Sequence, residues 1–305
     1  MKEPLVSVLM PVFNAQRFLY EAVQSILSQT LVNFELIIID DGSKDDSYKI
    51  VETLSNIDKR IRLYRQNNCG ISYTRNKLLS LAKADLIAWM DADDISHPTR
   101  LEKQYTYLQA NKEYVAIGTS TIMIDEDGDE IFDWKAPLKH SEIDSFHMKG
   151  NGGAIIFPSS MMRKENVTAL GGFNENLIGA EDLCLFLRLA EIGRLANLKE
   201  NLFYYRQHIE SICHSQKPNI TENKLSVINN CKLRRGIVPN NNLTPIKSLS
   251  IISFNDIYLK WGWWAIKGKR FHTAKKYGFK VIRNNFFSRQ AWLIVYFSIL
   301  KKNIS

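Results

Sequence analysis

Apolar runs alternate with helical patterns through the first third of the chain. Leu5–Val12 is a largely apolar run, and Asn14 can cap the next segment, whose apolar residues recur at helical spacing up to Leu27. The pattern returns as strand 34–39 with a helix through 50–57, strand 61–64 with helix 72–81, and strand 85–90. This alternation predicts an α/β domain with a mostly parallel sheet and helices on both faces.

The following segments are more mixed. Pro98 suits the first turn of a helix that carries Leu101 and Leu108, and a strand is expected at 114–124 before turn chemistry at 125–128. Further along, a strand at 153–157 and a helix beginning near Glu181 are expected to complete the same domain on its acceptor side.

Composition favours one large domain with an appendage. The 305 residues are 45% hydrophobic, and no internal repeat is visible. Four cysteines, at 69, 184, 213 and 231, form no CxxC pair, which argues against a zinc site or disulfide framework and favours a reducing compartment. The late apolar stretch 291–300 is far shorter than the ~20 residues that a membrane-spanning helix needs.

The charge is unevenly distributed. Residues 216–305 hold 17 Lys and Arg against two acids, whereas residues 1–215 hold 23 against 30. We therefore predict a catalytic domain at 1–215, with its nucleotide half at about 1–112 and its acceptor half at about 113–215, followed by a basic helical extension at 216–305. A basic extension implies an acidic partner.

Acidic residues follow two of the predicted strands. Asp40-Asp41 ends one and Asp91-Ala92-Asp93-Asp94 ends the other, and ligands of open α/β sheets bind beyond the carboxyl ends of strands. Converging carboxylates repel one another unless a cation lies between them, which favours Mg²⁺ or Mn²⁺ with a diphosphate. The alternatives are a strand-to-helix turn with a cap at 41–43 and a solvated acidic turn at 91–94.

Together these features resemble the inverting glycosyltransferases of family 2, which have the GT-A fold. The resemblance covers roughly residues 5–210 and is carried by the segments 7–14, 35–43, 68–72 with Arg75-Asn76, 91–94, Gly171-Gly172-Phe173, and Glu181-Asp182 with Leu185 and Arg188.

The resemblance implies roles for individual residues. The nucleotide-sugar site would contain Pro11, Phe13, Asp41, Asn68, Arg75, Asp91 and Arg206, with Asp41 bonded to the base and Arg75 near the base and phosphates. Asp93 would be the principal metal ligand, with Asp91 beside it, and the metal would bridge the donor phosphates.

The pair Glu181-Asp182 would be the catalytic acidic motif, with Asp182 as the base that deprotonates the acceptor hydroxyl during inverting attack. An acidic first helical turn is its structural alternative. His208 would lie near the metal or diphosphate, although a lone histidine is more often a packed or surface residue. Arg206 would pair with the diphosphate or form a structural salt bridge.

The extension offers two interpretations. Its aromatic residues, among many Lys and Arg, either face an anionic membrane surface or pack two basic helices on the catalytic domain. The first places the chain in the cytoplasm, peripheral on the inner face of the plasma membrane, with an acceptor such as a polyprenyl-diphosphate-linked sugar of O-antigen, lipopolysaccharide or capsule synthesis.

The expected activity is metal-dependent transfer of a hexose from a UDP-sugar to a hydroxyl of a glycan acceptor. A nucleotidyltransferase of similar fold is one alternative, but no P-loop or GxGxxG motif is present. A nucleic-acid-binding protein that uses the basic tail is another. The acidic first part of the chain and the lack of a nucleic-acid-binding motif argue against nucleic acid as a partner.

Overall fold

The computed structural model describes residues 3–150, 153–209, 220–238 and 253–301. They form two compact units. The first contains the described parts of Met1–Thr121, Lys135–Phe203 and Asn219–Asn242, and the second those of Ile122–Trp134, Tyr204–Pro218 and Leu243–Ser305. The predicted domain boundary after residue 215 lies outside the described residues.

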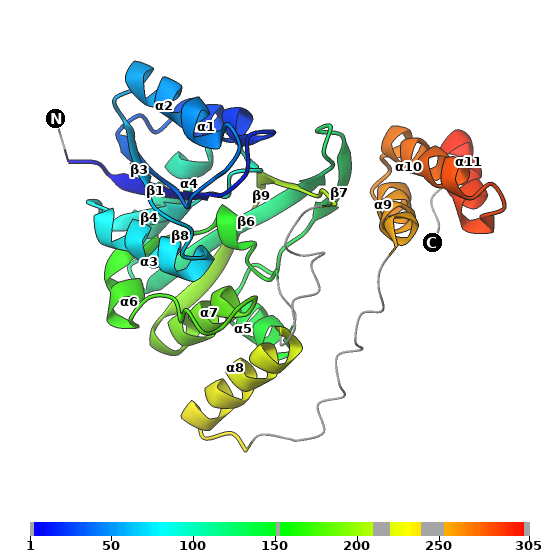
Figure 1. The fold of residues 1–305 in the computed structure, drawn as a ribbon. Coiled ribbons are helices and arrows are strands. Elements are labelled where there is room, and N and C mark those ends of the chain that lie inside the picture. The colour runs from blue at the N-terminus through cyan, green and yellow to red at the C-terminus, as the bar shows by residue number, and fades with distance from the viewer. Residues whose placement is uncertain (1–2, 151–152, 210–219, 239–252, 302–305) are drawn as a thin grey trace. The chain divides into compact units, whose positions relative to one another are not determined.

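Strands and helices alternate through the first part of the chain (Figure 1). The strands are β1 (Val6–Val12), β2 (Phe34–Asp40), β3 (Ile61–Arg65), β4 (Leu86–Trp89), β5 (Ile95–Ser96), β6 (Tyr114–Ile124), β7 (Glu130–Trp134), β8 (Met161–Arg163) and β9 (Arg194–Arg206). The helices are α1 (Leu19–Leu27), α2 (Ser47–Ile57), α3 (Ile71–Leu81), α4 (Arg100–Ala110), α5 (His140–Met148), α6 (Lys164–Ala169), α7 (Glu181–Ile192), α8 (Ile220–Arg234), α9 (Phe254–Lys267), α10 (Phe271–Asn284) and α11 (Arg289–Leu300).

The strands form one mixed sheet in the order β3-β2-β1-β4-β8-β6-β9-β5, with β7 paired to β6. The four strands at one end, β3, β2, β1 and β4, are parallel, as predicted. The sheet as a whole is mixed rather than mostly parallel, because β8 runs antiparallel to both β4 and β6.

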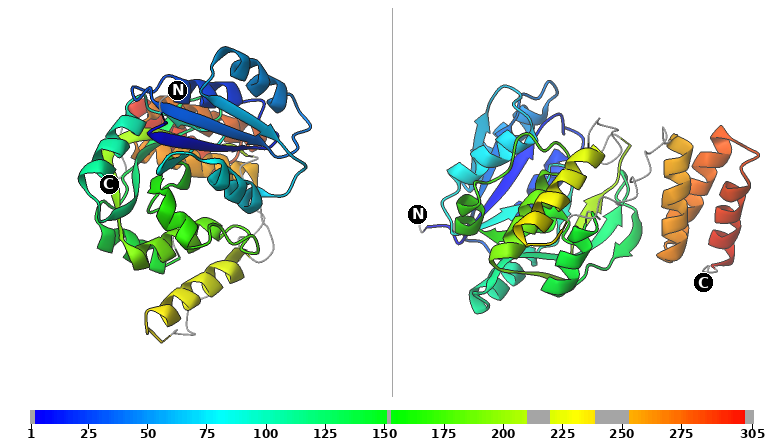
Figure 2. Two further views of the ribbon diagram at one scale, coloured as in Figure 1. Left: turned by 90° about the vertical axis from the view of Figure 1, so that its left-hand side faces the viewer. Right: turned by 90° about the horizontal axis from the view of Figure 1, so that it is seen from below.

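Both faces of the parallel strands are covered. Successive strand residues point to opposite faces, and Val8, Leu9 and Met10 of β1 are all fully buried. Leu9 packs with α3 and α7 in one core, while α1 and α2 lie beyond the other side of these strands (Figures 1 and 2). Burial on both faces explains why β1 and β2 read as continuous apolar runs rather than as alternating patterns.

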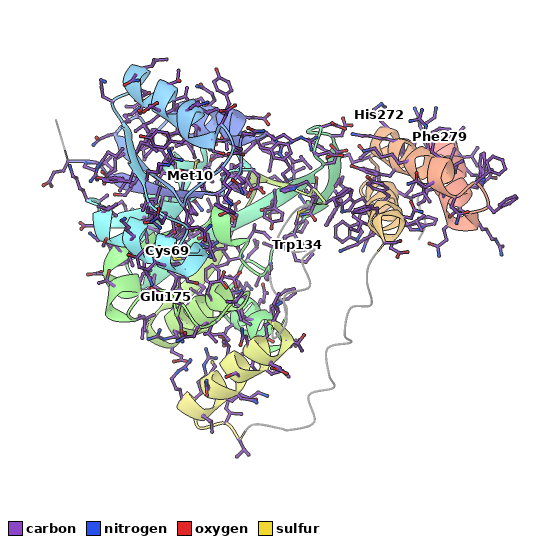
Figure 3. All side chains as sticks on the ribbon, in the orientation of Figure 1. Met10, Cys69, Trp134, Glu175, His272 and Phe279 are labelled. Atoms are coloured by element: carbon purple, nitrogen blue, oxygen red, sulfur yellow. The ribbon has the colours of Figure 1, made fainter. Side chains whose placement is uncertain are left out.

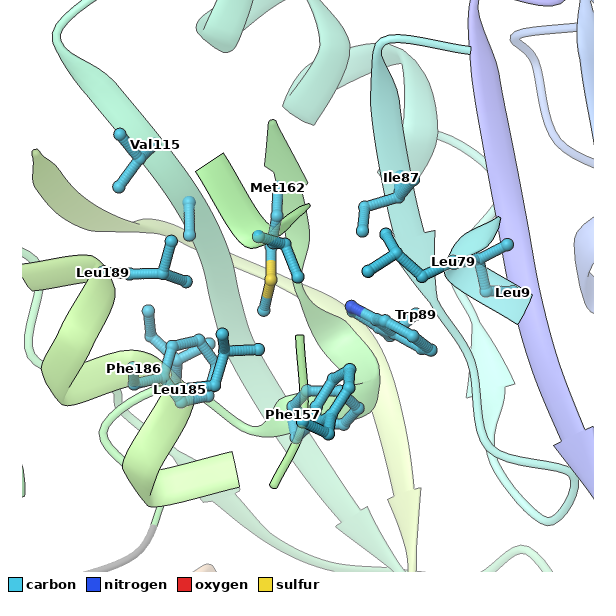
Figure 4. Packing of buried hydrophobic residues seen from close by; sticks show 14 of the residues in the cluster. Leu9, Leu79, Ile87, Trp89, Val115, Phe157, Met162, Leu185, Phe186 and Leu189 are labelled. Atoms are coloured by element: carbon cyan, nitrogen blue, oxygen red, sulfur yellow. The ribbon is translucent and has the colours of Figure 1, made fainter. Parts of the chain in front are cut away.

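Aromatic side chains fill the centre of this core. Trp89 packs against Phe157 and Phe173, with 5.2 Å between ring centroids in each pair. Figure 4 shows Trp89 and Phe157 with Met162 of β8, and Phe186 of α7 further along the same cluster. The end of β4 is therefore held firmly just before the acidic segment that follows it.

Two local expectations were wrong. Asn14 does not cap α1, whose N-cap is Phe18; it instead adopts a left-handed backbone with φ 48° and accepts a hydrogen bond from the Lys44 amide. The segment predicted as a strand at 153–157 is irregular and leads into a single 3-10 turn at Phe157–Ser159. Pro158 has no amide hydrogen for a strand ladder, which explains why pairing resumes only at β8.

The second unit joins a hairpin tip to three helices. Asp125 closes the turn between β6 and β7, where its Oδ1 accepts hydrogen bonds from the amides of Asp127 and Asp129. Lys276 of α10 lies 2.7 Å from carboxylate oxygens of Asp125, Asp127 and Asp129, and the Tyr277 hydroxyl donates to Asp125 Oδ2. Ion pairs therefore tie the helices to the turn.

Among the described residues, no helix combines the length and apolar character needed to cross a bilayer.

Candidate functional site

The parallel register brings the predicted acidic segments to one edge of the sheet. Val12 lies opposite Asp40, and Leu9 lies opposite Trp89, so β1, β2 and β4 end on the same side. The residues that follow β2 and β4 therefore emerge together at the carboxyl edge, where ligands of open α/β sheets bind.

Asp41 is buried and organises the loop before α3. Its Oδ1 accepts hydrogen bonds from Gln66 Nε2 at 2.8 Å and the Cys69 amide at 2.9 Å, and its Oδ2 accepts one from the Gly70 amide at 3.0 Å. A carboxylate has about four acceptor positions, of which the described residues fill three at Asp41. Figure 3 labels Cys69 at this loop.

Gly42 allows this loop to approach closely. Its φ is +78°, and a Cβ built there would lie 2.8 Å from the Asn68 backbone nitrogen. The Asn68 side chain is exposed, as is Phe13 just beyond β1, while Pro11 is buried within that strand. Phe13 and Asn68 thus remain available to a ligand, and their predicted role in nucleotide binding stays a prediction.

Arg75 occupies the centre of the edge. Its guanidinium is buried, donates from Nη1 to Glu181 Oε1 at 3.2 Å, and has Nη2 3.9 Å from Asp91 Oδ1. It stacks on Phe157 at 4.1 Å from the ring centroid. One buried cation therefore contacts acidic groups from two segments that are distant in the sequence, the one after β4 and the start of α7.

Asp91, Asp93 and Asp94 form an acidic cluster. One carboxylate oxygen from each lies within 4.8 Å of those of the other two. Oxygen ligands at this spacing, with Asp94 buried and the other two partly accessible, fit a hard divalent cation that keeps waters and substrate oxygens as its other ligands. The donor set thus suits Mg²⁺ or Mn²⁺, and a soft metal would require sulfur or imidazole ligands instead.

The electrostatics of Asp91 agree with a cation site. Burial raises the pKa of Asp91 to about 6, and the neighbouring carboxylates of Asp93, Asp182 and Glu181 act in the same direction against the opposing effect of Arg75. Excess negative charge at this edge is what a cation would relieve.

Glu181 and Asp182 begin α7 at the same site. Glu181 is buried and bonded to Arg75, whereas Asp182 is more accessible and its Oδ1 accepts a hydrogen bond from the Leu183 amide at 2.7 Å. Arg75 lies within 4 Å of both Glu181 and Asp91, so the predicted catalytic pair and the predicted metal ligands share one neighbourhood. The two acids therefore have different environments: Glu181 is bound to Arg75, whereas the Asp182 carboxylate is partly accessible to solvent.

Arg206 and His208 belong to the second unit. Arg206 is buried and donates from Nη1 to the Asp125 carbonyl oxygen at 3.1 Å. His208 is partly exposed and is not part of the Asp91, Asp93 and Asp94 cluster. Their roles at the diphosphate and metal stay predictions.

Sequence reasoning missed His147 of α5. This side chain is buried and stacks on Phe186 with ring centroids 5.3 Å apart. It also interacts electrostatically with Asp182. Burial lowers the pKa of His147 to about 4, against the opposite influence of Asp182 and Asp144, so the ring is neutral near pH 7. The sequence gives no indication of this role, because His147 is a single histidine that lies outside the acidic motifs.

Arg100 was also missed. It is fully buried and donates from Nη1 to the carbonyl oxygens of Trp89 and Pro158. Burial lowers the pKa of Arg100 to about 9, and the negative charge of Asp94 acts in the opposite direction. Arg100 therefore stabilises the acidic segment through the Trp89 carbonyl oxygen and the charge of Asp94. The sequence does offer a signal for Arg100, because a buried carboxylate needs a cationic neighbour and Arg100 follows closely after the acidic segment 91–94.

Known proteins share these features. The model of glycosyl transferase family 2 matches residues 7–170. The chain is 34% identical over 217 residues to the O-antigen biosynthesis glycosyltransferase WbnJ of Escherichia coli, covering 68% of this chain and 81% of that protein.

Two solved structures have a similar fold. TarS 1–349 of S. aureus in complex with UDP-GlcNAc aligns with a TM-score of 0.61 at 16% identity, covering 97% of this chain and 87% of that one. The mannosyltransferase PcManGT of Pyrobaculum calidifontis, in complex with GDP-Man and Mn²⁺, aligns with a TM-score of 0.56 at 17% identity, covering 98% and 81%. These similarities confirm the expected GT-A fold.

The family model spans more than half of the chain, and its matched region contains the parallel strands, Asp41, Arg75 and the acidic cluster. The expectation drawn from the sequence is therefore confirmed: this chain belongs to glycosyltransferase family 2.

Proposed function

We propose that this glycosyltransferase moves a hexose from a UDP-sugar to a hydroxyl of a glycan acceptor, with inversion at the anomeric carbon and dependence on Mn²⁺ or Mg²⁺. The observation that carries the proposal is the gathering of four charged groups around Asp91 at the carboxyl edge of the sheet: the buried Arg75 and the carboxylates of Asp93, Glu181 and Asp182. A diphosphate, a cation and an acceptor hydroxyl are the chemical groups that such an edge would serve.

The donor would lie along the loops after β1, β2 and β3. Asp41 has one acceptor position left for a base N–H, and the exposed Phe13 ring offers an apolar surface beside it. The UDP-GlcNAc bound by TarS supports a uridine nucleotide, while the GDP-Man bound by PcManGT shows that related folds accept other bases.

The metal would be held by Asp93, with Asp91 and Asp94 beside it. When bound, it would neutralise charge on the departing diphosphate. The Mn²⁺ in PcManGT supports this assignment. Arg75 would act from the protein side, since its guanidinium already lies 3.9 Å from Asp91 and supplies a fixed positive charge.

Asp182 would accept the acceptor proton. As the hydroxyl oxygen attacks the anomeric carbon, the C–O bond to the diphosphate breaks, UDP leaves with the bonding electrons, and the hydroxyl proton passes to a carboxylate oxygen of Asp182. Its Oδ1 is bonded to the Leu183 amide, which orients the group. Glu181 is committed to Arg75 and so is assigned a positioning role.

The acceptor would be a sugar on a polyprenyl diphosphate, used in building O-antigen, lipopolysaccharide or capsule. The O-antigen enzyme WbnJ supports a polysaccharide pathway. A lipid-linked acceptor would place the enzyme on the cytoplasmic face of the plasma membrane.

Product analysis tests the proposal. The chain should release UDP, and no pyrophosphate, from one member of a panel of UDP-sugars when Mn²⁺ and a glycan acceptor are present, and the anomeric proton coupling of the product should show inverted configuration. Release of pyrophosphate would identify a nucleotidyltransferase instead, and retained configuration would remove Asp182 from the role of base.

A further inference from the structure

Helix α11 has two opposite apolar faces. Ala291, Ile294, Val295 and Ser298 are buried, and with a 3.6-residue repeat they share one side of the helix. The other side carries Trp292, Leu293, Tyr296, Ile299 and Leu300, all of which are exposed. A helix that is apolar on all sides is normally buried on all sides. The exposed face of α11 is not covered by any of the described residues, and it is therefore a candidate contact surface.

The buried face is already filled by the neighbouring helices. A Cβ on Gly278 of α10 would lie 2.6 Å from Val295 Cγ2, and one on Gly262 of α9 would lie 2.9 Å from Ile294 Cδ1. Glycines therefore let α9 and α10 approach α11 closely, and Figure 2 shows the three helices together. The three helices are therefore closely packed, and the exposure of the other face of α11 does not result from loose packing.

Two phenylalanines extend the exposed face at the turn before α11. Phe287 is 92% exposed and Phe286 62% exposed, and the Phe286 ring packs edge-on against both Phe287 and Trp292. Trp292 Nε1 donates to the Phe286 carbonyl oxygen at 2.8 Å, which fixes the turn against the helix. The apolar surface thus consists of ordered aromatic and aliphatic side chains.

The helices that carry this surface are rich in positive charge. Residues 254–301 contain ten Lys and Arg against the single acid Asp256. Arg270, Lys276 and Lys280 pair with the hairpin between β6 and β7. The exposed cations for which the described residues show no acidic partner are Lys267, Lys269, Lys275, Arg283, Arg289 and Lys301. Arg289 and Lys301 lie at the two ends of α11.

We infer that the exposed face of α11 and the Phe286-Phe287 turn dock on the surface of an anionic lipid bilayer. Apolar and aromatic side chains would enter the headgroup boundary while flanking cations contact the lipid phosphates. The twelve residues of α11 measure about 18 Å, against about 30 Å of hydrocarbon, so the helix would lie in the interface. A second copy of the chain is disfavoured as partner, because two such faces would repel.

Flotation of the full chain with vesicles tests this inference. Vesicles of phosphatidylethanolamine with phosphatidylglycerol should carry the protein, and vesicles of phosphatidylcholine alone should carry much less. The triple variants Phe287→Ser/Trp292→Ser/Ile299→Ser and Arg283→Gln/Arg289→Gln/Lys301→Gln should each lower the partition coefficient by at least roughly tenfold.

Matched controls come from the first unit. Tyr20→Ser/Val32→Ser/Ile57→Ser removes three exposed apolar side chains, and Lys44→Gln/Lys59→Gln/Lys112→Gln removes three exposed cations. Both should bind vesicles as the unchanged protein does, and unchanged thermal midpoints would show that all four variants fold. Equal binding by the α11 variants would overturn the inference, as would a dimer in light scattering that only the Phe287, Trp292 and Ile299 changes dissociate.

Discussion

Arg75 Nη1 donates a hydrogen bond to Glu181 Oε1 at 3.2 Å, and this buried pair joins helix α3 to the first turn of helix α7. The Arg75 guanidinium also stacks on Phe157 and faces Asp91. The proposed nucleotide side and the proposed acceptor side of the site therefore share one cation, which Glu181 helps to position.

Glu181→Gln should destabilise the protein, because it leaves Arg75 buried with only Asp91 to balance its charge. We expect a loss of about 2–3 kcal/mol in the free energy of unfolding, measured by urea denaturation. The double variant Arg75→Met/Glu181→Gln should lose less than the sum of the two single losses. Additive losses in this cycle would contradict the pairing.

Asp182→Asn should lower kcat by about 100-fold to 10,000-fold, because the amide cannot accept the acceptor proton. The KM for the donor should change little, since Asp182 is assigned to the acceptor. Asp85→Asn makes the same chemical change at an exposed position before β4 and should leave kcat unaltered. A rise in the KM for the acceptor with kcat unchanged would argue for a binding role instead.

Asp93→Asn should weaken the response to metal. Activity of the unchanged protein should vanish with EDTA and return with Mn²⁺, whereas the variant should need at least about tenfold more Mn²⁺ for half-maximal activity, in line with the removal of one hard ligand. Asp85→Asn again serves as the control. Activity of the unchanged protein in EDTA would exclude the proposed metal dependence.

Gly42→Ala should impair donor binding as well as stability, because its φ of +78° is strained for alanine and the new Cβ would lie 2.8 Å from the Asn68 nitrogen. Gly128→Ala is the matched control, since its φ is +86° but no atom lies within 4 Å of the new Cβ. Both should lose about 1 kcal/mol from backbone strain. Only Gly42→Ala should raise the Kd for UDP, as isothermal titration would show.

His147 should make the protein sensitive to mild acid. Burial lowers its pKa from 6.5 to about 4, so the unfolded chain takes up a proton at a pH where the folded protein does not. The free energy of unfolding should therefore fall as pH drops from about 6.5 to about 4, by roughly 3 kcal/mol in total.

His147→Phe should keep the stacking on Phe186 and remove this part of the pH dependence, as thermal melts at pH 7 and pH 4.5 would show. His272→Gln changes an exposed histidine on α10 and should keep the slope of the unchanged protein (Figure 3). An identical slope in His147→Phe would locate the acid sensitivity elsewhere.

The fold and the position of the site follow from patterns that the sequence displays directly. Strands buried on both faces leave uninterrupted apolar runs, and parallel strands must end at one edge, so Asp41 and Asp91 could be placed together from their positions after β2 and β4. Both statements depend on chain topology and not on side-chain detail.

Other features depend on contacts between distant segments. The left-handed backbone of Asn14, the irregular path at 153–157 and the burial of His147 are each determined by tertiary neighbours such as Ser43 and Phe186. Local propensity favours a helix cap for Asn14 and a strand before Phe157, and tertiary packing overrode both.

The reciprocal bonds between the loops after β1 and β2 have a consequence for catalysis. The Asn14 amide donates to Ser43 Oγ, Asn14 Oδ1 accepts from the Lys44 amide, and Gln16 exchanges similar bonds with Asp45 and Asp46. Two chain segments that would otherwise fluctuate independently are thereby ordered when the protein folds. If the nucleotide binds along these loops as proposed, its affinity would not be diminished by the entropy of ordering them, and more of the binding free energy would remain to orient the sugar for attack.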